Sequence, residues 1–193
     1  RWTVHNLLEW IDGKRVSHRQ ASKRLKGSRH LILGEHKILL PSLFSYYAIK
    51  DVPRAIKMVH SGEIKQWIRR SVSDARLDTR YDMAVGAGQE QVAQANADER
   101  TISRLCAAME PGFPILYRTV NLFPDSFGTV LADFVMREQD LKPLVELIND
   151  QAVAFWMNMQ NELPSDFNAT ISRFEQCQQF IKQRLIGYGM ERC

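Results

Sequence analysis

Apolar positions in the last third of the chain recur every three or four residues, which is the spacing of one helix face. Over residues 140–163 the pattern comprises Leu141, Val145, Ile148, Ala152, Trp156, Met159 and Leu163. Over residues 165–186 it comprises Phe167, Ile171, Phe174, Ile181 and Leu185. Pro164 separates the two segments, so the sequence predicts two long helices paired as an antiparallel hairpin. The second set of apolar residues is also the expected surface for a protein partner.

The first residues of the chain predict short helices followed by one small β-hairpin. Residues 3–11 have apolar side chains at helical spacing, and a Ser17–Gln20 capping box predicts a helix over residues 18–26. In the stretch HLILGEHKILLP, residues 30–41, two apolar runs flank a Gly-Glu-His turn. Such an arrangement is typical of a hairpin rather than a helix.

Three more helices are expected before residue 73. Pro41 suits the first turn of a helix through residue 50, because its missing N–H is not needed there. Asp51 and Pro53 open a helix to about residue 60. Ser61 is the expected N-cap of a helix over residues 62–72.

The middle of the chain divides the sequence into two parts. Residues 85–98 are rich in Gly, Ala and Gln, and they predict a linker between a basic helical subdomain, residues 1–84, and an acidic one, residues 99–193. One continuous domain is the alternative. Residues 99–109 have a helical pattern, and residues 115–123, between prolines, form either one extended strand or an ordered loop. The expected fold class is mainly α, a multi-helix domain with the C-terminal hairpin and one small β-hairpin.

Charge follows the same division. Residues 1–80 carry 17 Lys and Arg against 7 Asp and Glu, whereas residues 81–193 carry 9 against 15. The basic half suits an acidic protein, nucleic acid or an anionic lipid surface, and the alternative is that the two halves face each other.

The basic charge is densest between residues 14 and 37, where Glu35 is the only acid. The candidate residues for binding nucleic acid or an acidic partner are Lys14, Arg15, Arg19, Lys23, Arg24, Lys26, Arg29 and Lys37. The alternative is a solvated helix face. Residues 22–32 also resemble the middle of a helix-turn-helix, with Ser28 as the cap of the second helix and Ile32 as its buried position. Tyr46 and Tyr47 are expected in the core rather than stacked on bases.

Other kinds of chemistry have little support in the sequence. The three cysteines Cys106, Cys177 and Cys193 form no CxxC pair, which favours a reducing, cytoplasmic location over a disulfide framework. No metal, cofactor or catalytic motif is recognised, no small-molecule ligand is expected, and no apolar run is long enough for a transmembrane helix.

These observations favour a non-enzymatic protein-interaction or regulatory module of a larger intracellular protein. A nucleic-acid-binding domain that uses residues 14–37 is the alternative. The chain begins at Arg1 rather than Met, so we expect it to be a piece of a longer protein.

Overall fold

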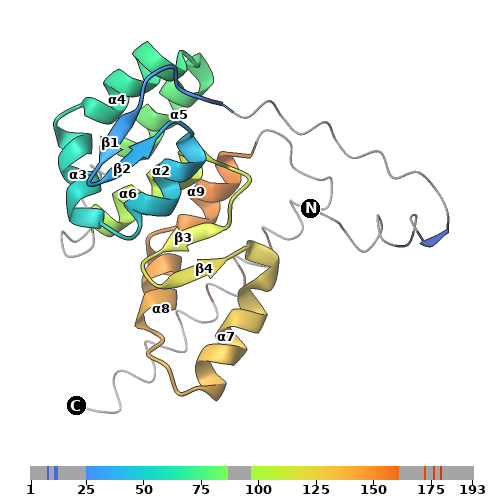
Figure 1. The fold of residues 1–193 in the computed structure, drawn as a ribbon. Helices are drawn as coiled ribbons and strands as arrows, with labels where there is room; N and C mark the ends of the chain where they lie inside the picture. The colour runs from blue at the N-terminus through green and yellow to red at the C-terminus, as the bar shows by residue number, and fades with distance from the viewer. Residues whose placement is uncertain are drawn as a thin grey trace.

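The computed structural model describes residues 25–86 and 97–160, with a few single positions elsewhere, and is mainly helical (Figure 1). Two antiparallel hairpins are formed by β1 (Leu31–Leu33) with β2 (His36–Ile38) and β3 (Ile115–Tyr117) with β4 (Val120–Leu122). The helical elements before residue 87 are α2 (Pro41–Ala48), α3 (Val52–His60), α4 (Glu63–Trp67), the π-helical turn η1 (Ile68–Val72) and α5 (Ala75–Gly86). Those after residue 96 are α6 (Ala97–Met109), the 3-10 turn η3 (Pro124–Ser126), α7 (Phe127–Met136), α8 (Lys142–Asn149) and α9 (Ala152–Asn158).

The predicted elements between residues 30 and 60 are confirmed. Leu31 pairs with Ile38 and Leu33 with His36, so β1 and β2 form a hairpin with a two-residue turn. Pro41 is the first residue of α2, and the Asp51 carboxylate caps α3 by accepting a hydrogen bond from the Arg54 N–H at 3.2 Å.

Three local predictions are wrong. Residues 31–33 are a strand, so the second helix of a helix-turn-helix does not exist there. The N-cap of α4 is Gly62, whereas Ser61 ends α3 and its hydroxyl donates to the Met58 carbonyl at 3.2 Å. Residues 68–72 form a π-helical turn instead of continuing an α-helix.

A second hairpin lies within residues 115–123, for which the sequence predicted either one extended strand or an ordered loop. β3 and β4 pair through a turn in which Arg118 has a positive φ of 50°. A non-glycine residue pays a steric cost in this conformation, and here tertiary contacts hold it. The Arg118 guanidinium lies 2.7 Å from the Glu146 carboxylate on α8.

The long helix expected over residues 140–163 is instead two helices, α8 and α9. They are separated by Asp150 and Gln151, and Gln151 has a left-handed backbone with a φ of 54°. The predicted partner helix and its hairpin lie outside the described residues, apart from Ser172, Gln176 and Gln179. These three residues are helical and exposed.

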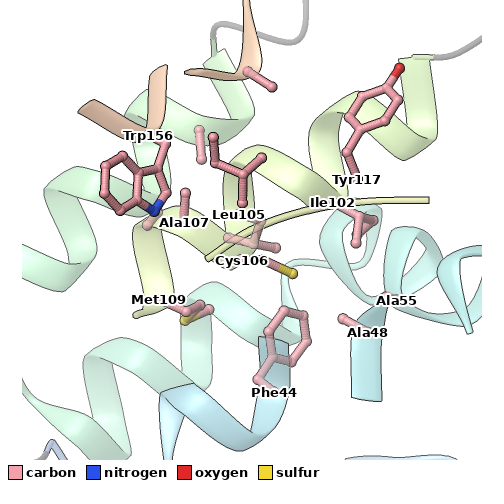
Figure 2. Packing of buried hydrophobic residues seen from close by; sticks show 14 of the residues in the cluster. Phe44, Ala48, Ala55, Ile102, Leu105, Cys106, Ala107, Met109, Tyr117 and Trp156 are labelled. Carbon is pink, nitrogen blue, oxygen red and sulfur yellow. The ribbon is translucent and has the colours of Figure 1, made fainter. Parts of the chain in front are cut away.

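Helix α6 occupies the centre of the core and contacts α2, α3, α5, β3 and α9. Figure 2 shows side chains from α2, α3, β3 and α9 gathered around Ile102, Leu105 and Cys106 of α6. A pair of hydrogen bonds joins α2 to α6: the Ser45 hydroxyl donates to the Cys106 carbonyl at 3.1 Å, and the Cys106 thiol donates to the Ser45 carbonyl at 3.6 Å.

The core contains residues from both sides of the expected linker. Phe44 and Ile64 come from the first half and Leu105 and Leu147 from the second, and each is fully buried in the same cluster. Residues 87–96, where the chain passes between the halves, lie outside the described ranges, so the predicted boundary stays a prediction. No helix within the described ranges has the length and apolarity needed to cross a membrane.

Three buried groups predict a loss of stability at alkaline pH. Burial raises the pKa of Tyr81 and that of Cys106 to about 12, and burial with a hydrogen bond to Asp150 raises the pKa of Tyr117. Each folded-state pKa exceeds the ordinary value of 9.0 for the thiol or 10.0 for the phenols. The stabilisation is therefore complete below about pH 9 and is lost as the pH rises towards 12.

Urea titrations should show an equal free energy of unfolding at pH 7 and 8 and a progressive decrease at about pH 10 and 11. The Tyr81→Phe variant should show a smaller decrease, because it removes one of the three ionisations. A free energy of unfolding that is constant to pH 11 would contradict the assigned burial.

Candidate functional site

Positive charge is concentrated on the part of the fold that contains the β1–β2 hairpin. Residues 25–72 include nine Lys and Arg against three Asp and Glu, whereas residues 97–160 include five against nine. Some cations of the first group are paired, such as Arg69 with Asp78 at 3.0 Å and Lys65 with Asp82. Among the described residues, no acidic group lies within ion-pair distance of Lys26, Arg29, Lys37, Lys57 or Arg70.

The chain leading into β1 is held at three points. The Gly27 N–H donates to the Leu39 carbonyl at 2.7 Å, and the Ser28 N–H donates to the Ser71 carbonyl at 3.0 Å. The Trp67 indole N–H donates to the Arg29 carbonyl at 2.7 Å. A Cβ at Gly27 would lie 3.1 Å from the Trp67 indole, so glycine permits this close approach. The backbone of Arg29 is thereby fixed while its side chain remains exposed.

A hollow of about 340 Å³ lies between β1 and the end of α4; we call it the π-turn hollow. Its lining comprises Arg29, His30, Leu31, Ile32, Glu63, Gln66, Trp67, Arg70 and Ser71. The Ser73 N–H closes the π-helical turn on the Ile68 carbonyl at 2.8 Å. Short π-helical turns often occur at functional sites, and this one carries Arg70 at the hollow. The hollow thus joins two arginines that are distant in sequence.

One acid lines the π-turn hollow. The Glu63 carboxylate accepts a hydrogen bond from the Ser61 hydroxyl at 3.1 Å. Arg29 and Arg70 also line this space, so the two arginines outnumber this one acid. The hollow is therefore suited to an anion.

A second hollow, of about 430 Å³, lies where the β1–β2 turn meets α2 and α3; we call it the tyrosine hollow. Its lining comprises Leu33, Gly34, Glu35, His36, Tyr46, Tyr47, Lys50, Asp51 and Arg54. The rings of His36 and Tyr47 are stacked with their centroids 3.9 Å apart, and Tyr46 meets Tyr47 edge-on at 5.1 Å. The Lys50 ammonium lies 3.8 Å from the centre of the Tyr46 ring. Aromatic and cationic groups therefore share one opening.

Gly34 shapes the rim of the tyrosine hollow. Its φ of +63° is a conformation that favours glycine, and a Cβ there would lie 2.4 Å from a terminal nitrogen of Arg54. Arg54 also lies 3.4 Å from the Asp51 carboxylate, although both side chains are about half exposed. The turn residue therefore leaves room for the guanidinium beside the hairpin.

Residues of the β1–β2 hairpin line both hollows, Leu31 and Ile32 in the π-turn hollow and Leu33 to His36 in the tyrosine hollow. Ile32 and Lys37 pair across the strands, and both are exposed, whereas Leu31, Leu33 and Ile38 point into the core. Together these groups form what we call the hairpin face, defined as Arg29, His30, Ile32, His36, Lys37, Tyr46, Lys50, Arg54 and Arg70.

The structure describes only part of the predicted basic stretch. Lys26, Arg29 and Lys37 are exposed, and Arg29 and Lys37 belong to the hairpin face. Lys14, Arg15, Arg19, Lys23 and Arg24 lie outside the described residues, as do the predicted interaction residues Phe167, Ile171, Phe174, Ile181 and Leu185.

Seven residues of the hairpin face were not predicted as site residues: His30, Ile32, His36, Tyr46, Lys50, Arg54 and Arg70. The expectation that Tyr46 is buried is wrong, because half of its surface is exposed. The sequence did contain one signal, an aromatic pair followed within one helical turn by Lys50. It did not show that the hairpin turn packs beside them.

A different kind of surface occurs on α7. This helix has the sequence FGTVLADFVM, yet only Phe127 is buried, while Val135 and Met136 are 58% and 84% exposed. Val130, Leu131 and Phe134 pack partly on the core. Asp133 and Arg137 form an exposed ion pair at 2.7 Å beside them. Apolar exposure of this kind is typical of interaction surfaces.

No group of three His, Cys, Asp or Glu within the described part of the chain could hold a metal ion. Comparison of the chain with known protein families, with curated proteins and with solved structures found no match.

Proposed function

We propose that the chain is a non-enzymatic binding module and that its hairpin face binds nucleic acid. The observation that supports this proposal is the pair of hollows on one hairpin, each combining cations with other polar or aromatic groups. A solvated helix face would place its cations on one helix. Here Arg29 and Arg70 line one hollow from two separate segments, and Lys37 pairs across the strands with Ile32, which lines the same hollow.

Phosphate oxygens are the natural ligands of such cations. Arginine donates two parallel hydrogen bonds to a phosphate, and neutralised phosphates release condensed counterions. Arg29 and Arg70 line the same hollow, and Lys37 lies on the connecting strand pair. An extended phosphate backbone could contact them in succession.

Binding should be measured by fluorescence anisotropy with a labelled 20-nucleotide oligonucleotide over a salt series. We expect micromolar or tighter affinity at low salt. If the face contacts four phosphates, the plot of log affinity against log salt should have a slope near −3, at about −0.7 for each phosphate on a single strand. A slope near zero, or no binding at low salt, would contradict the proposal.

A polyglutamate peptide of equal charge is the matched competitor. Failure of this peptide to compete supports recognition of nucleic acid, and equal competition would replace nucleic acid by an acidic protein as the partner. The proposal includes a reducing intracellular location, consistent with the buried free thiol of Cys106.

Protein docking is the second candidate function, and the exposed apolar side of α7 favours it. Glu138 and Asp140 follow the end of this helix, so a fitting partner is an amphipathic helix with basic flanks. If the oligonucleotide does not bind but a synthetic Leu-Lys amphipathic peptide binds at α7, protein docking becomes the better proposal.

A further inference from the structure

We infer that the tyrosine hollow receives an unpaired base, so that the nucleic acid on the hairpin face is single-stranded. This inference rests on the proposed function and specifies its substrate class. The hollow offers aromatic rings, and a base inside a duplex has both of its faces covered by neighbouring bases. Only an unpaired or splayed base presents a face to a protein ring.

The rings of the hollow form an incomplete stack. Tyr47 is half-buried and stacks on His36, with an angle of 16° between the rings. His36 is exposed, so the stack ends at solvent. Tyr46 stands nearly perpendicular to Tyr47, at 80°, and is half exposed. A base in the hollow would continue the stack on His36 and meet Tyr46 on its side.

Lys50 is the cation beside the rings that suits the phosphate of the same nucleotide, because Arg54 is 3.4 Å from the Asp51 carboxylate and Glu35 also lines the hollow. Lys50 lies over the Tyr46 ring, and Arg54 lies beside Gly34 at the turn. Lys50 has no acidic group within ion-pair distance among the described residues. The volume of about 430 Å³ is within the range of pockets for small ligands, which is sufficient for one base.

The π-turn hollow lies next to the tyrosine hollow and extends the proposed binding site along the hairpin. Leu31 and Ile32 line the π-turn hollow, and Leu33 and Gly34 line the tyrosine hollow. The two hollows are therefore separated by less than the length of β1, which is about 10 Å for three residues. One single-stranded nucleic acid can therefore place a phosphate at Arg29 and Arg70 and a base at Tyr46.

The test compares three labelled probes on the whole chain: a single strand, the same sequence as a duplex, and inorganic polyphosphate of similar charge. We expect the single strand to bind most tightly. In the Tyr46→Ala variant its affinity should fall about 5-fold, the lower end of the effect of an aromatic ring on a base, because Tyr46 meets the base on its side and the stack on His36 remains. Its salt slope should not change, because no cation is removed. Tyr46→Phe keeps the ring and should bind within about 2-fold of the unchanged chain.

The outcomes separate this inference from the proposed function. Equal binding of all three probes, with Tyr46→Ala unchanged, would overturn the base site and leave nucleic-acid binding by charge alone. No binding of any probe would reject the proposed function and this inference with it. A circular-dichroism melting curve shows whether Tyr46→Ala remains folded. If it does not, His36→Gln provides the same comparison.

Discussion

Replacing Asp150 by alanine is expected to lower the free energy of unfolding by about 3–5 kcal/mol. Asp150 lies at the end of α8, and its carboxylate is 3.7 Å from the guanidinium of Arg100 on α6. Both side chains are nearly inaccessible, at 10% and 6% exposure. Truncation would remove the carboxylate that faces a buried positive charge.

The same carboxylate has a second role. It accepts a hydrogen bond from the hydroxyl of Tyr117 on β3, and the Asp150 backbone carbonyl accepts one from Arg104 at 3.2 Å. Asp150 therefore joins α6, β3 and the junction of α8 with α9. Asp150→Asn retains an acceptor for Tyr117 but loses the charge, so its effect should be smaller than that of alanine.

The matched control is Asp133→Ala on α7. Asp133 also pairs with an arginine, Arg137, but the two side chains are 48% and 67% exposed. Removing this pair should change stability by no more than about 0.5 kcal/mol. Urea titrations of both variants give the comparison. Equal losses for Asp150→Ala and Asp133→Ala would show that Asp150 is not buried as the structure describes.

Local sequence signals were sufficient where a single residue determines the backbone. Pro41 predicted the start of α2, Asp51 predicted the cap of α3, and Gly34 marked the first hairpin. In each case the residue suits the local backbone: proline lacks an N–H that the first helical turn does not need, aspartate supplies a capping oxygen, and glycine adopts a positive φ. Tertiary contacts were not required to recognise them.

Prediction failed where tertiary contacts stabilise an unusual backbone. Gln151 has a positive φ that interrupts the helix, yet the apolar residues on both sides keep helical spacing. Arg118 likewise occupies a turn position where glycine or asparagine is the usual signal. Glu99 and Glu146, from α6 and α8, hold its guanidinium at 3.7 and 2.7 Å. No local pattern contains this information.

The candidate site was visible in part. The positive charge of residues 14–37 predicted an anion-binding region, and Arg29 and Lys37 belong to the hairpin face. Arg70 and Arg54 join it from distant helical segments. The proximity of Arg70 to Arg29 depends on the hydrogen bonds from Trp67 and Ser28 that fix the start of β1 beside α4. Such long-range pairings are not encoded in spacing along one helix.

Reversing two charges of the hairpin face should have the largest effect on binding. In the Arg29→Glu/Arg70→Glu variant, we expect the affinity for single-stranded nucleic acid to fall by about 100-fold or more. Each lost hydrogen bond to a charged phosphate is worth about 1.5 kcal/mol, and the new carboxylates repel the strand. The magnitude of the salt slope should decrease by about 1.4, because two phosphate contacts are lost.

The control variant, Arg76→Glu/Arg137→Glu, makes the same change in net charge at an exposed residue of α5 and at the exposed C-cap residue of α7, outside the hairpin face. If total charge governed binding, the two variants would weaken it equally. If the arrangement of Arg29 and Arg70 governs binding, the affinity of the control variant should fall by less than about 5-fold. Only long-range attraction is then lost, and physiological salt screens that attraction beyond about 8 Å. Since Arg29 and Arg70 are exposed, their replacement leaves the core intact. A loss of affinity confined to the first variant therefore reports on the binding surface and not on folding.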